Sequence, residues 1–136
     1  MKARITPFLS FTGQAEAAMN FYVEALPETT IKKLVRYGED NPHMPKDQSD
    51  RIMYGSLLCM GQEIQFLDMS DEYPAPPFNW ASSLYIDCCS EEEFDQIFAA
   101  LAAGGSVMMG PESVGAIRKC AWVVDRFGVT WQPVWA

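Results

Sequence analysis

The sequence predicts an α+β fold built from two tandem βαβββ modules. Three observations lead to this prediction: hydrophobic residues make up 49% of the chain, strand-like and helix-like segments alternate in a fixed order, and that order occurs twice. A chain of 136 residues can bury a core without disulfides or a metal. We therefore expect one domain over residues 1–136, with a first module at about 4–69 and a second at about 81–135.

The first module begins with a predicted strand, helix and strand. Arg4–Phe11 alternates loosely between apolar and polar side chains, which is typical of a strand. Apolar residues then recur at helical spacing over Ala15–Leu26, and Pro27 ends that helix. Thr29–Tyr37 is rich in β-branched residues and predicts the second strand.

A polar connection at 38–50 separates these elements from a predicted hairpin. Asn41-Pro42 and Met44-Pro45 favour turns within the connection. Arg51–Met60 and Gln62–Met69 then form two strands that turn at Gly61.

The same order resumes after a proline-rich linker at 70–79. Ser82–Cys88 predicts a strand, and Ser90–Glu93 is a capping box that opens a helix. Gly104-Gly105 ends that helix.

The second module closes with three predicted strands. They are a short strand at Ser106–Met109 before the Gly110-Pro111 turn, then Ala116–Val124 and Val129–Trp135. Phe21 corresponds to Ile97, 76 residues later, whereas the hairpin glycine Gly61 corresponds to Gly128, 67 residues later. The nine-residue difference indicates that the 38–50 connection is an insertion in the first module.

The composition restricts the binding partners and the cellular location that we expect. A net charge of −8 opposes binding to nucleic acid or to an anionic membrane, and favours cationic or neutral small ligands. No apolar run is long enough to span a bilayer. We expect a cytoplasmic protein whose four cysteines are free thiols.

A ligand site is expected on the sheet faces that the helices leave bare. One helix covers only one face of a four-stranded sheet, so two modules leave a shared concave cleft, and such surfaces bind small molecules. Gln65 and Gln132 lie between large apolar neighbours, so alternation directs their amides into the cleft. There they bond to each other, to water or to a ligand. The residues predicted to bind ligand are Leu9, Phe11, Tyr54, Gln65, Ser83, Tyr85 and Gln132.

Five segments together resemble the PhnB-like branch of the vicinal oxygen chelate superfamily, the group that includes glyoxalase I and bleomycin-resistance proteins. They are Ile5–Phe11, Ala15–Tyr22, Arg51–Met53, Leu101–Gly105 and Asp125–Trp131. This branch is also labelled 3-demethylubiquinone-9 3-methyltransferase-like. The resemblance implies the paired βαβββ fold, commonly as a homodimer, and no single reaction. Tyr54 occupies a position where many such sequences have histidine. Two roles are open for Tyr54: its hydroxyl donates a hydrogen bond to a ligand, or its ring packs against a neighbouring strand.

The resemblance also implies four positions that hold a divalent metal in catalytic members. Here they fall on Pro7, near Ala81, and on Gln65 and Gln132, which are 67 residues apart like the hairpin glycines. Neutral amides without histidine or carboxylate make a poor divalent site. We expect no obligatory metal or other cofactor, and divalent metal is disfavoured.

The function expected is therefore binding of a small molecule, with no catalytic residue assigned. The alternative is a metal-dependent lyase, isomerase or dioxygenase using Gln65, Gln132 and either Tyr54 or Glu63 around an ion. A third interpretation is a structural dimer with a collapsed cleft. A Rossmann methyltransferase is excluded, because no glycine-rich nucleotide loop follows a strand. His43, the single histidine, is expected in solvent.

Overall fold

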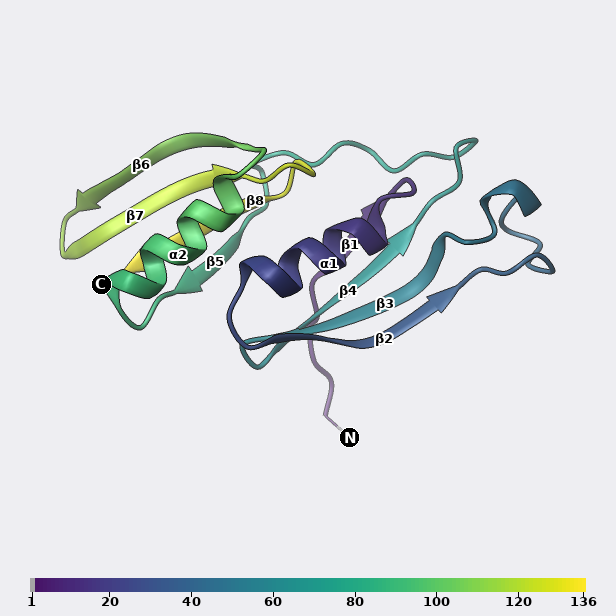
Figure 1. The fold of residues 1–136 in the computed structure, drawn as a ribbon, viewed down its shortest axis with the longest axis horizontal. Helices are drawn as coiled ribbons and strands as arrows, with labels where there is room; N and C mark the ends of the chain where they lie inside the picture. The colour runs from purple at the N-terminus through teal and green to yellow at the C-terminus, as the bar shows by residue number, and fades with distance from the viewer. Residues whose placement is uncertain (1) are drawn as a thin grey trace. The chain divides into compact units, whose positions relative to one another are not determined.

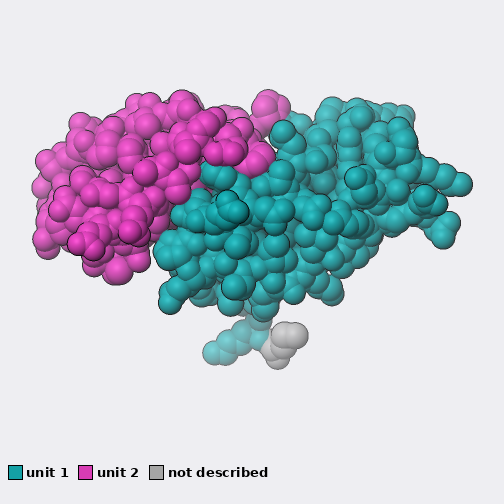
Figure 2. Space-filling model, in the orientation of Figure 1, with its two compact units in different colours: residues 1–76 teal, residues 77–136 magenta. Residues whose placement is uncertain are grey.

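The computed structural model describes residues 2–136, which form two compact units. Unit 1 is Met1–Pro76 and unit 2 is Pro77–Ala136 (Figure 2). The boundary falls inside the proline-rich stretch at 70–79, where the sequence predicts a linker. The predicted first and second modules thus each fall within one unit.

Unit 1 is a four-stranded sheet with one helix packed on it (Figure 1). Its elements are β1 (Phe8–Phe11), α1 (Ala15–Ala25), β2 (Thr29–Arg36), the short 3₁₀ helix η1 (Lys46–Gln48), β3 (Ile52–Cys59) and β4 (Gln62–Asp68). The strand order is β1-β4-β3-β2, with β1 parallel to β4 and the other pairs antiparallel.

Unit 2 repeats this arrangement. Its elements are β5 (Leu84–Asp87), α2 (Glu91–Ala102), β6 (Ser106–Val114), β7 (Ile117–Val124) and β8 (Thr130–Trp135). The strand order is β5-β8-β7-β6, again with the first and last strands of the unit parallel. The identical order of strands in the two units confirms the tandem βαβββ prediction.

In unit 1 the helix covers one face of the sheet. Tyr22 of α1 lies 6.1 Å from the ring of Phe66, and both side chains are almost completely buried. Gly55, paired with Phe66, leaves room for Met19, because a Cβ there would meet the Met19 sulfur at 2.6 Å. The apolar stripe of α1 therefore packs against the central strands, as its spacing predicts.

In unit 2 helix α2 begins at the predicted capping box. The Ser90 Oγ accepts a hydrogen bond from the Glu93 N–H at 3.1 Å, and the Glu93 carboxylate reaches back to the Cys89 N–H at 3.0 Å. Lys119 of β7 forms ion pairs with Glu91 and Asp95 of this helix. Lys119 therefore lies on the face of the second sheet that α2 covers.

A buried carboxylate organises each unit. Asp68, 1% exposed at the end of β4, accepts hydrogen bonds from the backbone N–H groups of Gly13, Ala15 and Ile52 at 2.8 to 3.0 Å. It thereby joins β4 to the start of α1 and to the start of β3.

Unit 2 also contains a buried carboxylate, Asp125, which is 3% exposed. It accepts hydrogen bonds from the backbone N–H groups of Phe127 and Val129, and from the indole N–H of Trp131 at 2.9 Å. The loop between β7 and β8 is closed around this side chain.

One strand is longer than the sequence predicts. The expected strand Ser106–Met109 continues as β6 to Val114, with register shifts around Gly110 and Pro111. Proline lacks a backbone donor, so it interrupts the pairing locally, but an edge strand tolerates such a break.

Among residues 2–136, no helix is both long enough and apolar enough to cross a membrane. Cys59, Cys88, Cys89 and Cys120 are free in the structure. Burial raises the pKa of the Cys88 thiol to about 11, which keeps that thiol protonated at neutral pH.

Replacing Asp68 by asparagine should lower the free energy of unfolding by about 2 kcal/mol or more, because an amide nitrogen would then face backbone donors in a buried position. The measurement is urea denaturation followed by far-UV circular dichroism. Asp71→Asn is the matched control: Asp71 is exposed and pairs with Arg51, so its loss should cost under about 1 kcal/mol. Equal losses in the two variants would contradict the organising role of Asp68.

Candidate functional site

The sheet face opposite α1 is the candidate site in unit 1, and we call it the helix-free face. Phe66 points at α1, so its neighbour Gln65 points the other way. Strand register places Ser56 of β3 and Phe8 of β1 beside Gln65 on that face.

Gln65 and Tyr54 are brought together on the helix-free face. The Gln65 Nε2 donates to the Tyr54 hydroxyl at 3.1 Å, and both side chains are half-buried. The Lys33 ammonium lies 5.8 Å from the centre of the Tyr54 ring. Tyr54 therefore carries a polar contact and a cation–π contact.

A carboxylate lies beside this pair. Glu63, two residues before Gln65 on the same strand face, accepts from the Ser56 hydroxyl at 2.5 Å and pairs with Arg4 at 2.6 Å. The hydrogen bond from Ser56 is the main cause that lowers the pKa of Glu63, and the charge of Arg4 adds to it. The helix-free face of unit 1 therefore holds an ionised carboxylate at neutral pH.

Unit 2 has a related pair. The Gln132 Nε2 donates to the Ser83 hydroxyl at 2.6 Å. Tyr85 is level with Gln132 in the parallel pairing of β5 and β8, and it is 55% exposed. Lys119 of β7 contacts α2, and its partner in the register is Trp135 of β8, so Trp135 lies on the helix side of the sheet. Gln132 is three residues before Trp135 on the same strand and therefore points away from α2.

Two of the predicted site residues lie on the wrong face. Leu9 pairs with Phe66, and Phe11 stacks on the Phe66 ring at 5.9 Å, so both face the helix side of the sheet. Phe11 is 4% exposed and belongs to the core. The expectation that Leu9 and Phe11 lie on the same sheet face as Gln65 is wrong. The parallel register places Phe8 and Ser10 on the helix-free face instead.

The residues beside the two amides do not fit a resident divalent metal. Phe8, not Pro7, is level with Gln65, and its ring has no donor atom. The residue level with Gln132 is Tyr85, a phenol. Within residues 2–136 no group of three His, Cys, Asp or Glu side chains is placed to hold a metal ion. Glu63, a carboxylate on the same strand face as Gln65, is already bonded to Ser56 and Arg4.

His43 lies apart from this donor set in sequence and structure. It is exposed in the connection between β2 and β3, and its backbone N–H donates to the Asn41 side chain at 2.9 Å. Its position agrees with the expectation of a solvated side chain.

Four polar residues of the helix-free face were not among the predicted ligand-binding residues: Arg4, Lys33, Ser56 and Glu63. The spacing of Glu63 is a signal in the sequence, since residues i and i+2 of a strand share a face and Gln65 lies two residues after Glu63. Ser56 could be found only from the register of β3 against β4.

The same fold and related sequences occur in known proteins. The PhnB protein of Bacillus cereus is 34% identical, with 98% of this chain and 100% of that chain covered and a TM-score of 0.81. The YjdN protein of Escherichia coli strain K12 is 27% identical over 93% of this chain and 91% of that protein.

A more distant structure shows the fold alone. It is a member of the glyoxalase/bleomycin resistance protein/dioxygenase superfamily from Sphaerobacter thermophilus, 16% identical over the full length of both chains, with a TM-score of 0.57. The model of the 3-demethylubiquinone-9 3-methyltransferase family matches residues 3–134. With nearly its whole length matched, and with two βαβββ units in tandem, the chain belongs to this PhnB-like family of the glyoxalase and bleomycin-resistance fold.

Proposed function

We propose that the protein binds a small molecule at the helix-free faces of its sheets, without an obligatory metal ion. The observation that carries the proposal is the pair of Gln65 and Tyr54. The Gln65 amide gives a hydrogen to the Tyr54 oxygen, so the Gln65 Oε1 remains as an acceptor and the Tyr54 hydroxyl keeps its own hydrogen as a donor. Both groups are half-buried, where bonding to a ligand is favourable.

The pair in unit 2 supports the same proposal. Gln132 gives a hydrogen to Ser83, which leaves an amide oxygen and a hydroxyl hydrogen in the same relation. Tyr85 supplies an exposed aromatic surface beside them. A ligand with an apolar body and a group that both donates and accepts hydrogen bonds, such as an amide or alcohol, complements these residues.

Methyl transfer is not part of the proposal, although the family description names it. Each unit has a four-stranded mixed sheet covered by one helix, rather than the doubly wound parallel sheet that binds dinucleotides. We also propose a cytoplasmic homodimer. The four free cysteines favour a reducing compartment, and the resemblance to PhnB-like proteins favours the dimer. Native mass spectrometry measures the oligomeric state directly.

Small aromatic fragments test the binding proposal, and benzamide is the first probe because it carries one amide on an apolar ring. We expect neutral fragments to shift the Nε2 side-chain signals of Gln65 and Gln132 in ¹H–¹⁵N NMR spectra. Gln65→Leu should weaken binding about three- to tenfold, as the loss of one hydrogen bond implies. Gln62→Leu is the control, since Gln62 lies on the same strand but bonds to the Glu63 backbone. A fragment set that shifts neither amide would refute the proposal.

Metal binding distinguishes this proposal from a metal-dependent enzyme. Because the amides carry no charge to offset dehydration of an ion, substoichiometric Mn²⁺ should leave the Gln65 and Gln132 side-chain signals sharp. Selective broadening of both signals, together with stoichiometric metal in the purified protein, would instead favour the lyase, isomerase or dioxygenase alternative.

The charge on Glu63 predicts a pH dependence. Its pKa is lowered below the ordinary 4.5 in the folded protein, so its contribution to stability is present above the unfolded value and is lost as the pH falls through the folded value. A ¹³C NMR titration of the carboxyl carbon should show that Ser56→Ala raises this pKa more than Arg4→Gln does. No change in the serine variant would show that the hydroxyl does not hold the charge.

A further inference from the structure

Unit 1 has a cavity that none of the proposed ligand-binding residues lines. Its volume is about 620 Å³, within the usual range for small-molecule sites. Two segments form it, the start of the β2–β3 connection and the turn that follows β4. Its lining includes Tyr37, His43, Met44, Met69, Glu72 and Tyr73.

Hydrogen bonds hold the walls of this cavity in place. The Tyr37 hydroxyl donates to the Asp68 carbonyl at 2.6 Å, which fixes the ring. The Met69 carbonyl accepts from the Arg51 guanidinium at 2.9 Å. Met44 is only 5% exposed, so the connection folds back on the unit instead of extending into solvent. A site whose walls are already ordered loses little entropy when a ligand binds.

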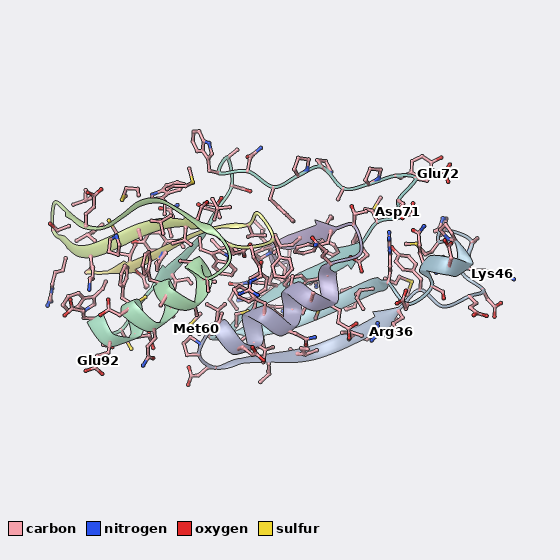
Figure 3. The ribbon with its side chains drawn as sticks, turned by 45° about the horizontal axis from the view of Figure 1, so that its top comes forward. Arg36, Lys46, Met60, Asp71, Glu72 and Glu92 are labelled. Atoms are coloured by element: carbon pink, nitrogen blue, oxygen red, sulfur yellow. The ribbon has the colours of Figure 1, made fainter. Side chains whose placement is uncertain are left out.

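The lining is apolar and aromatic, with a single carboxylate. It contains two tyrosines, two methionines and two prolines, but no lysine or arginine. The nearby Arg51 guanidinium bonds to the Met69 carbonyl and to Asp71. Glu72 is exposed and, among residues 2–136, no cation pairs with it. Figure 3 shows Glu72 at the turn after β4 and Lys46 on the separate short helix η1.

We propose that this cavity binds a small organic cation, with an ammonium group between the tyrosine rings and Glu72 and an apolar body against Met44 and Met69. Aromatic faces attract cations, and thioethers adapt to irregular apolar groups. The carboxylate supplies the one formal charge, and the net charge of −8 raises the local concentration of cations. Neither Gln65 nor Gln132 lines this cavity, so the proposal does not rest on the amide pairs of the proposed function.

Benzyltrimethylammonium is the probe, with benzyl alcohol and benzoate as neutral and anionic comparisons. Titration followed by ¹H–¹⁵N NMR should give saturable shifts at residues 37–45 and 69–73 for the cation, with weaker binding of both comparisons. Glu72→Gln should weaken binding of the cation about three- to fivefold, as expected for an exposed charge pair. Tyr73→Ala should weaken it about threefold through loss of a cation–π contact.

Glu39→Gln is the matched control, because it removes the same charge from an exposed position in the same connection but does not line the cavity. Binding should be unchanged in this variant. Three results would overturn the proposal: no saturable shift with the cation, equal binding of benzoate, or equal weakening in the Glu39 and Glu72 variants. Shifts confined to Gln65 and Tyr54 would also overturn it, while leaving the proposed function intact.

Discussion

The structure of unit 1 depends on one buried carboxylate that gathers N–H groups from separate segments, and unit 2 has a buried carboxylate that closes a single loop. Asp68 binds the backbone of the β1–α1 turn and of β3, so the position of the helix and the pairing of the strands are set by one side chain. Asp125 binds backbone and indole donors around the β7–β8 loop. A buried charge is costly unless several donors surround it, and this cost makes alternative arrangements of these turns unfavourable.

In unit 1 the two faces of the sheet differ because α1 is held over one of them. With α1 fixed over Phe66, the opposite face is left for side chains that would be too polar for the core. Gln65, Tyr54 and Glu63 lie there, held by hydrogen bonds that orient them without using all of their hydrogen-bonding capacity. A helix-covered core and a polar, partly satisfied face therefore arise from the same alternation along β4.

Much of this organisation could be predicted from the sequence, because helix spacing, hairpin glycines and their repetition are local signals. The direction of Gln65, away from the helix, can be predicted from its large apolar neighbours. The sheet face on which Leu9 and Phe11 lie cannot be predicted in this way. It depends on the parallel register of β1 and β4, which are separated by 50 residues, and neither strand encodes that register alone. The contact of Gln132 with Ser83 likewise depends on the pairing of β5 with β8.

The 38–50 connection shows why the two units should not be regarded as functional copies. It is the part of the first unit that the second lacks, and it contributes four of the nine residues that line the 620 Å³ cavity. The shared strands supply a polar pair in both units. In unit 1 alone, the inserted connection adds proline, histidine and methionine side chains that line a cavity with a single carboxylate. Duplication accounts for the common scaffold and its amide pairs, and the insertion accounts for a surface of different chemistry.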